Sequence, residues 1–494
     1  MKKLFSFLFS MFFSVVLLLI FAFAIAYATF IENDYGTPVA QALVYRAWWF
    51  ELLLLIGVVN LSGSVIKYKL VTRKKWAILL FHLAFILIIV GAGVTRYFGF
   101  EGSMHIREGE ATNQVVSDET FVTVNVKSGT SAVTRSVKVL FTPFTSNHYR
   151  EAISLGGKEV FIENEMYVPN AAETIVPDPN GVPCLSLVHS EGMARELEFV
   201  LAQNQKKTIS GLSFGFDTGA GSAKVVFSQS GGGLSVVCSD TLTVSSMTGN
   251  TAEKVAPGSS VAIQATNLFR VGASVFMLKN FMPKAQLSLV QHDNDVQSEN
   301  AQNAFLAKIS SGNETSHVNV FERDGQVTAP ANCTINGLDV SVSYGAIVRE
   351  LPFSIYLRDF QLERYPGSMS PSSYASEITL KDPASSVEKP FRIFMNNILK
   401  YQGYRFFQTS FDRDEKGTVL SVNHDYWGTL ISYLGYFFMA LGMAFTVFSR
   451  QSRFQTLVRL SSKLQARRKV VKIALLVLAL SGVGVGEHTF AADS

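Results

Sequence analysis

The sequence predicts a membrane protein that combines α-helical transmembrane spans with a large exported all-β, sandwich-like domain. Three observations lead to this prediction. Four apolar segments are long enough to cross a hydrocarbon core, which takes about 20 residues. Basic residues gather in short loops beside those segments, and residues 96–426, between the third and fourth segments, have strand periodicity and frequent turn residues.

The four predicted spans are residues 4–30, 47–66, 77–94 and 427–448, and a shorter apolar segment at 473–485 is a fifth. The first segment follows Lys2 and Lys3, which is also typical of a secretion signal. Its apolar run is longer than the roughly 7–15 residues of a signal's hydrophobic region. A retained span is therefore expected.

Charge predicts the orientation. Residues 67–76 contain five Lys or Arg and residues 450–472 contain eight, and neither segment contains an acid. Both are expected to be cytoplasmic, because short basic loops stay on that side of the membrane. The protein is then expected in the cytoplasmic (inner) membrane with its large domain in the periplasm or outside. The net charge is only +4, so the sequence predicts no nucleic-acid surface.

The expected domain order follows from these segments. It has three transmembrane helices in residues 1–95, an exported β domain in 96–426, a fourth helix in 427–449, a basic cytoplasmic loop in 450–472, and a fifth helix with a short exported tail in 473–494.

The β prediction rests on alternating or β-branched runs such as residues 121–126 (FVTVNV) and 338–344 (LDVSVSY), separated by Gly-, Ser- and Asn-rich turns. The three cysteines contain no C-x-x-C, which argues against a thioredoxin-like redox site and a zinc site. One structural disulfide and isolated buried thiols both remain open. The cysteines are Cys184, Cys238 and Cys333.

His82 is the candidate site residue. It lies inside the otherwise apolar segment 77–94, and a titratable ring at membrane depth is costly enough to suggest a function. Imidazole is a common axial ligand of haem iron. The alternative is a histidine that only hydrogen-bonds a neighbouring helix. Five other histidines lie in the polar exported block without ligand-like spacing and are expected to be solvated: His105, His148, His189, His292 and His317.

Residues 391–436 resemble a signature of the ResB/CcsB family of cytochrome c biogenesis proteins. The matching positions include Tyr401, Gly403 and Gln408. Residues 102–109 and 351–365, with Ser376, resemble the segment after the third span and the strands before the signature. The remaining matches are Asn396, Phe407, Ser410, Ser421, Val422, Asn423, Asp425 and Gly428.

The resemblance implies a function in cytochrome c biogenesis of the System II type, and the pattern is closest to the CcsB part of a fused CcsB–CcsA protein. Such a component works with a CcsA/ResC-type membrane protein to carry haem b across the membrane. The haem is then attached to the C-x-x-C-H motif of apocytochrome c. Within that family His82 matches a proposed axial haem-iron ligand. No catalytic residue is implied, and the chain is expected to be a non-catalytic part of a holocytochrome c synthase.

The alternative from a different class is a membrane-anchored exported β domain that acts as a scaffold or sensor. A sensor needs a cytoplasmic output module. The longest predicted cytoplasmic segment is residues 450–472. This segment is too short to form such a module, which disfavours the sensor.

Overall fold

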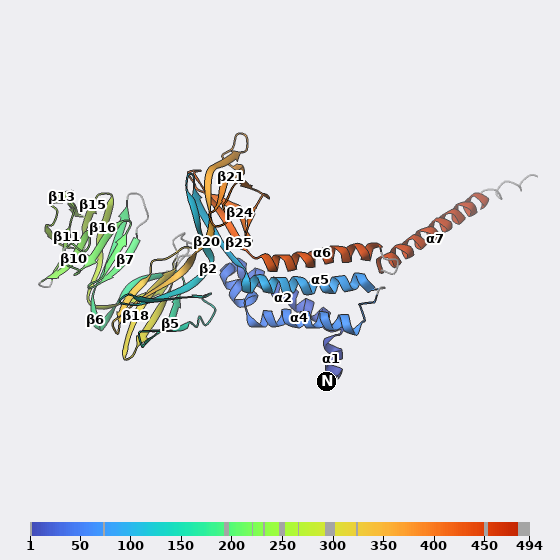
Figure 1. The fold of residues 1–494 in the computed structure, drawn as a ribbon, viewed down its shortest axis with the longest axis horizontal. Coiled ribbons are helices and arrows are strands. Elements are labelled where there is room, and N and C mark those ends of the chain that lie inside the picture. The colour runs from blue at the N-terminus through green and yellow to red at the C-terminus, as the bar shows by residue number, and fades with distance from the viewer. Residues whose placement is uncertain are drawn as a thin grey trace, which may run out of the picture. The chain divides into compact units, whose positions relative to one another are not determined.

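The computed structural model describes residues 2–72, 75–191, 197–219, 221–230, 233–246, 252–264, 266–291, 302–322, 325–448 and 453–482 (Figure 1). The chain divides into two compact units. The first contains Met1–Val115 and Glu350–Ser494, and the second contains Val116–Arg349. The exported block 96–426, expected as a one- or two-lobed β sandwich, contributes its middle part to the second unit, and its two ends group with the helices.

Four described helices are long and apolar enough to cross a membrane, as predicted: α2 (Met11–Tyr35), α4 (Trp48–Lys67), α5 (Trp76–Phe98) and α6 (Tyr426–Phe448). The first predicted span begins as a separate short helix, α1 (Lys2–Leu8). Ser10 then caps α2, because its Oγ accepts a hydrogen bond from Phe13 N at 3.2 Å. Helix α3 (Thr37–Ala40) and the π-helical turn η1 (Gln41–Tyr45) connect α2 to α4.

The C-terminal part differs from the expected loop followed by a fifth span. Helix α7 (Arg453–Gly482) runs through both segments, and it is not among the four candidate spans of the described chain. The basic residues that favoured a loop are compatible with a helix, because Lys and Arg are good helix formers. Residues 483–494, with the predicted tail and His488, lie outside the described residues.

Helices α5 and α6 pack closely along their lengths (Figure 1). Three glycines at seven-residue spacing on α6, Gly428, Gly435 and Gly442, are buried against α5. A Cβ atom at Gly435 would lie 3.0 Å from the carbonyl oxygen of Ala84. Small residues that let two backbones approach are the usual basis of helix packing in membranes. The α5–α6 pair is therefore a tightly fitted unit.

One curved antiparallel sheet continues directly from this helix pair. Strand β1 (Phe100–Arg107) follows α5, and strand β25 (Gly417–His424) leads into α6. The two strands are paired, with Phe100 opposite His424. The sheet has the order β22-β21-β20-β2-β1-β25-β24-β23. The other strands are β2 (Ala111–Ser128), β20 (Leu338–Arg364), β21 (Pro371–Asp382), β22 (Val387–Phe394), β23 (Leu399–Tyr401) and β24 (Tyr404–Phe411).

The second unit contains a β sandwich. A six-stranded sheet, β13-β12-β15-β16-β6-β7, packs on a five-stranded sheet, β14-β11-β10-β9-β8. Their cores meet where Phe214 of β9 contacts Phe276 of β16 at a ring-centroid distance of 5.3 Å. A four-stranded sheet, β18-β17-β5-β4, has a separate core shared with β2 and β20. The strands are β3 (Ser131–Lys138), β4 (Arg150–Leu155), β5 (Lys158–Val168), β6 (Ala171–Glu191), β7 (Leu197–Ala202), β8 (Lys206–Ile209), β9 (Leu212–Phe216), β10 (Val225–Ser230), β11 (Gly233–Cys238), β12 (Leu242–Ser246), β13 (Ala252–Val255), β14 (Ser260–Ala262), β15 (Asn267–Val271), β16 (Ser274–Gln291), β17 (Asn303–Ser311), β18 (Glu314–Glu322) and β19 (Ala331–Ile335).

The three cysteines are free thiols, so the disulfide alternative does not hold. Cys184 and Cys238 are buried and Cys333 is partly buried. Burial raises the pKa of each thiol, because the thiolate would be poorly solvated there. They are expected to be unreactive core residues.

His189 corrects the prediction that the histidines of the exported block are solvated. Its side chain is only 1% exposed and neither ring nitrogen has a hydrogen-bond partner in the described chain. Burial lowers its pKa, although the nearby charge of Glu191 opposes the shift. His105, His148 and His317 are exposed as predicted. His292 lies outside the described residues.

Candidate functional site

His82 lies on α5, six residues from the start of the helix, which is about 9 Å along its axis. Its side chain is half-buried. The Nδ1 atom lies 2.9 Å from the carbonyl oxygen of Ile78, one turn earlier. A carbonyl oxygen can only accept, so Nδ1 carries the proton and donates. With the proton on Nδ1, the lone pair that would bind a metal is on Nε2.

The side of α5 that carries His82 faces away from α6. Successive residues on a helix are rotated by about 100°, so His82 lies on the opposite side of α5 from Ala84, which packs against Gly435 of α6. It shares its own side with Phe85 and Ile89, three and seven residues further on. His82 is therefore not part of the α5–α6 contact.

A cavity of about 380 Å³ lies among α2, α4 and α5, and Phe85 and Ile89 form part of its wall. Its volume falls in the range of small-molecule sites. His82 itself is not a lining residue but lies one turn along the same face of α5. The remaining lining residues are Ser14, Leu17, Leu18, Phe21, Leu53, Leu54, Gly57, Asn60, Leu61 and Ile88.

The polar groups of this cavity wall are Ser14 and Asn60. Asn60 is 3% exposed, and its amide is satisfied by protein atoms alone. Its Oδ1 accepts from Ser14 Oγ at 2.7 Å, and its Nδ2 donates to the carbonyl oxygen of Leu8 at 2.6 Å. A satisfied buried amide at membrane depth joins α4 to the start of α2. It also leaves the rest of the cavity apolar.

The signature residues near the membrane connect the sheet to the helices. Asp425 caps α6, because its Oδ1 accepts from Gly428 N at 3.0 Å, and its Oδ2 accepts from Thr95 Oγ1 of α5 at 2.5 Å. Gly428 has no space for a side chain, since a Cβ would lie 2.3 Å from Thr95 Oγ1. These residues therefore hold together the end of α5 and the start of α6, next to the sheet.

A second connection is centred on Arg405 of β24. Its Nη2 donates to Asn423 Oδ1 at 2.5 Å and to Thr429 Oγ1 of α6 at 2.9 Å. Asn423 in turn donates to Glu101 Oε1 of β1 at 2.9 Å. The signature residue Asn423 thus joins three adjacent strands to the first turn of α6.

Sequence reasoning missed a third connection, at the ends of α4 and α5 that lie next to the sheet. Arg96, at the end of α5, forms an ion pair with Glu51 of α4 and donates from Nη1 to the carbonyl oxygen of Tyr45 at 2.7 Å. Tyr97 also donates to Glu51, at 3.0 Å. Single charges at the ends of apolar segments were the signal in the sequence that could have indicated this contact.

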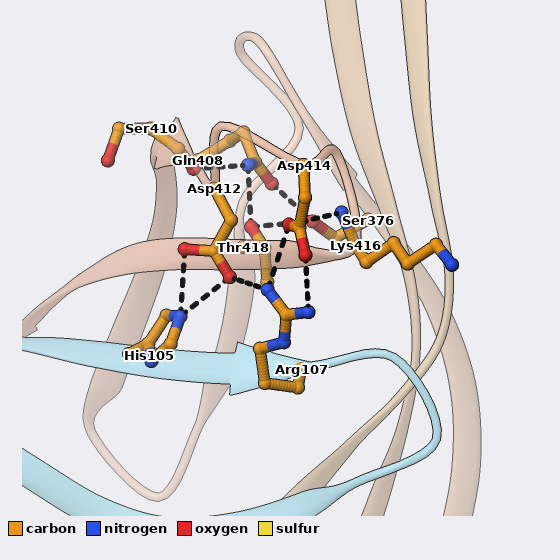
Figure 2. Close-up of polar contacts among 9 residues, drawn as sticks. All are labelled: His105, Arg107, Ser376, Gln408, Ser410, Asp412, Asp414, Lys416 and Thr418. Carbon is orange, nitrogen blue, oxygen red and sulfur yellow. Dashed lines mark hydrogen bonds and ion pairs between the residues drawn. The ribbon is translucent and has the colours of Figure 1, made fainter. Parts of the chain in front are cut away.

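At the opposite end of β24 and β25, a charged cluster closes the hairpin (Figure 2). Asp412 accepts from His105 Nε2 at 2.9 Å and from Arg107 Nη1 at 2.6 Å. Arg107 also binds both oxygens of Asp414, at 2.9 and 2.6 Å. His105 is 54% exposed, so the expectation of a surface histidine is right, although the ring has a partner.

The signature residue Gln408 belongs to the buried polar network next to this cluster (Figure 2). Its Oε1 accepts from Ser376 Oγ at 2.6 Å, and its Nε2 donates to Thr418 Oγ1 at 2.7 Å. Ser376 and Thr418 are fully buried. Because each member is satisfied, the network stabilises the curved sheet.

The cluster predicts an acid-sensitive fold. Hydrogen bonds from Arg107 hold the pKa of Asp414 at about 2, below its usual value of 3.8. A carboxylate with a depressed pKa contributes stability above its unfolded value and loses it as the pH falls from about 4 to 2. Arg107→Ala should lower the melting temperature at pH 7 and reduce the further loss between pH 4 and 2, measured by the strand signal in circular dichroism. The control Lys279→Ala, which removes an exposed ion pair with Glu198, should change neither.

Among the described residues no group of three or more His, Cys, Asp or Glu is arranged to hold a metal ion. At the end of the sheet next to the helices, Arg405 and Asp425 contact α6. At the opposite end, the charged cluster of Asp412 and Asp414 closes the β24–β25 hairpin. Among the helices, the candidate ligand position is the side of α5 that carries His82, next to the cavity of about 380 Å³.

Comparisons with known proteins agree with the signature. The family model of the ResB-like family matches residues 71–160 and 314–425. A protein named NrfI from Wolinella succinogenes is 30% identical over 443 residues, which cover 90% of this chain and 35% of that protein. The chain thus spans about a third of the length of this relative. Among solved structures, the crystal structure of MucB in complex with MucA(peri) covers 64% of this chain and 92% of that one at 11% identity, with a TM-score of 0.08 that supports no argument about fold.

Proposed function

This chain belongs to the ResB-like family, and from this premise we propose that it serves cytochrome c biogenesis of the System II type as a carrier of haem across the membrane. In this proposal haem b is cargo, bound transiently with its iron on His82 Nε2. The chain lies in the cytoplasmic membrane, and its β units lie on the periplasmic side, in line with the basic loops at the other ends of the spans.

The observation that carries the proposal is the hydrogen bond from His82 Nδ1 to the carbonyl oxygen of Ile78. Ligating histidines usually donate their second ring nitrogen to a carbonyl or carboxylate, which fixes the tautomer and the orientation of the ring. For a histidine that only joins two helices, the partner would be expected on another helix. The partner of His82 is on its own helix, and Nε2 has no hydrogen bond in the described chain.

The surroundings of His82 also suit a flat apolar cargo. The cavity among α2, α4 and α5 begins one turn away on the same face of α5, and most of its wall is Leu, Ile and Phe. One edge of a porphyrin on Nε2 could enter it. The protein's contribution would be to hold and orient the ring and to keep water from the iron.

The second axial ligand and the attachment step belong to partners. We propose a CcsA/ResC-type membrane protein as the source of that ligand, and an apocytochrome c with a C-x-x-C-H motif as the final acceptor. The chain on its own would be a non-catalytic part of the holocytochrome c synthase.

The proposal is tested in cells that depend on this chain for cytochrome c maturation. His82→Ala should lower covalently bound haem in c-type cytochromes by at least about tenfold, since even loss of an outer partner of a ligand costs this much metal affinity. The readout is peroxidase staining of denatured cytochromes at matched levels of the membrane protein. The control His148→Ala changes an exposed histidine and should have no effect. Full maturation with His82→Ala would refute the proposal.

Filling the cavity gives an independent prediction. Gly57 lines the cavity, and a Cβ there would meet nothing within 4 Å. Gly57→Leu should therefore fold normally but reduce the haem that co-purifies with the chain, because the leucine occupies the space next to the ring. Gly93→Leu is the matched control, since Gly93 of α5 also has open space around it but does not line the cavity. Equal haem in the two variants would place the porphyrin elsewhere.

A further inference from the structure

Helix α7 carries a strong charge of one sign. Its first 20 residues, 453–472, contain seven Lys or Arg and no acidic residue. Every side chain from Thr456 to Val477 is exposed. The described chain therefore leaves residues 457–477 of this helix uncovered.

Within residues 457–467 of α7, the leucines and the basic side chains lie on different sides of the helix. Leu457, Leu460 and Leu464 lie on one side of the helix, three and four residues apart, and are 60%, 52% and 60% exposed. Arg459, Lys463 and Arg467, at four-residue spacing, lie along a neighbouring side. From Ile473 onward the helix is apolar on all sides. The separation is thus confined to residues 457–467, because Arg468 follows Leu464 by four residues and returns to the leucine side.

We propose that the basic half of α7, Arg453–Lys472, lies on the surface of the membrane and binds the headgroups of anionic phospholipids. The three leucines insert into the boundary between headgroups and acyl chains. The basic side chains beside them extend their stems along the apolar surface and reach the phosphates. The positive-inside pattern puts this surface on the cytoplasmic side.

Position in the chain supports a lipid partner. Four residues separate the end of the span α6 at Phe448 from the start of α7 at Arg453, so α7 cannot move far from the bilayer. Its local concentration at the headgroups is therefore high without any further contact. The neighbouring connection between α4 and α5 is also basic, with Lys67, Lys69 and Lys75.

Charge favours lipid over protein as the occupant. A partner protein would have to present an extended acidic surface beside an apolar groove, to a helix with no acid of its own. An anionic leaflet supplies both the dense negative charge and the apolar layer below it, and each nearby Lys or Arg adds to the attraction. A basic amphipathic helix is typical of this type of binding.

The test uses the full chain in vesicles of phosphatidylcholine, alone or with one third phosphatidylglycerol. A fluorophore on Leu464→Cys, with the native cysteines replaced by serine, reports insertion through quenching by brominated lipid. We expect strong quenching in the anionic vesicles and its loss in phosphatidylcholine alone. We also expect its loss at 1 M salt, where screening acts over about 3 Å. A label on Ser462→Cys, on the opposite side of the helix, should be quenched much less.

Charge variants show whether the quenching depends on headgroup binding by the basic side chains. Arg459→Gln, Lys463→Gln and Arg467→Gln together keep a good helix former at each position and should abolish quenching in the anionic vesicles. The matched control changes three exposed lysines of the second unit, Lys127, Lys254 and Lys284, to glutamine and should leave it intact. Quenching that is equal in both vesicle types and insensitive to salt would contradict the proposal. The absence of quenching in both vesicle types would also contradict it and would favour a protein as the partner of α7.

Discussion

Gly91→Val is expected to separate α5 from α6 and to destabilise the whole membrane part of the protein. A Cβ at Gly91 would lie 2.3 Å from Ser432 Oγ, 2.8 Å from Ser432 N and 3.0 Å from the carbonyl oxygen of Gly428. Two of these atoms belong to the backbone of α6 and cannot rotate away. Overpacking of this kind costs about 1–3 kcal/mol or more, and it acts on the contact between α5 and the first turns of α6.

Gly93→Val provides the matched control two residues further along the same helix. Gly93 has nothing within 4 Å of its Cβ position, and the two substitutions change helix propensity equally. The measurement is the melting temperature of the full chain in detergent, with the yield of folded protein. Equal melting temperatures for the two variants would show that α5 and α6 do not pack through Gly91.

The four spans could be predicted because length and hydropathy decide whether a helix crosses a membrane. Their pairing could not. The glycines on α6 matter only because α5 presents Ala84, Ile88 and Gly91 to them, and neither segment alone specifies its partner. The same reason explains why the cavity among α2, α4 and α5 was not foreseen.

The signature residues were found by pattern, but their roles required the fold. Asp425 would be recognised as a possible helix cap from its place before an apolar run. Its bond to Thr95 joins residues 330 positions apart. Asn423 likewise meets Glu101 across two strands whose pairing the sequence does not give.

The burial of His189 could have been predicted from the alternation of side chains along its strand. Strand β6 buries Leu185 and Leu187, and side chains two residues apart on a strand share a face. His189 continues that alternation and is therefore inside. The helix across 453–472 differs from the expected loop for another reason: a dense run of positive charge predicts sidedness and not secondary structure.

His82 was predicted as the site from the sequence and the family resemblance, and it stays a proposal. The structure adds two facts that the sequence could not supply: the bond from Nδ1 to Ile78, and the open side of α5. The second depends on how α5 packs against α6, which the sequence does not give. A ligating histidine and a histidine that only packs against a helix can therefore be distinguished by measuring bound haem.

His82→Ala should remove most of the haem that co-purifies with the chain and its partner. Added imidazole should restore part of it, because it can occupy the vacated axial position. A histidine that only joins helices would contribute about 0.6–2 kcal/mol of packing, and free imidazole would not replace that.

The most direct measurement is the haem Soret absorbance per mole of purified complex for wild type, His82→Ala, and His82→Ala with imidazole. The carrier account predicts a high, a low and a partly restored value, in that order. Unchanged haem in the alanine variant at matched protein levels would contradict the account and leave His82 as a structural residue of α5.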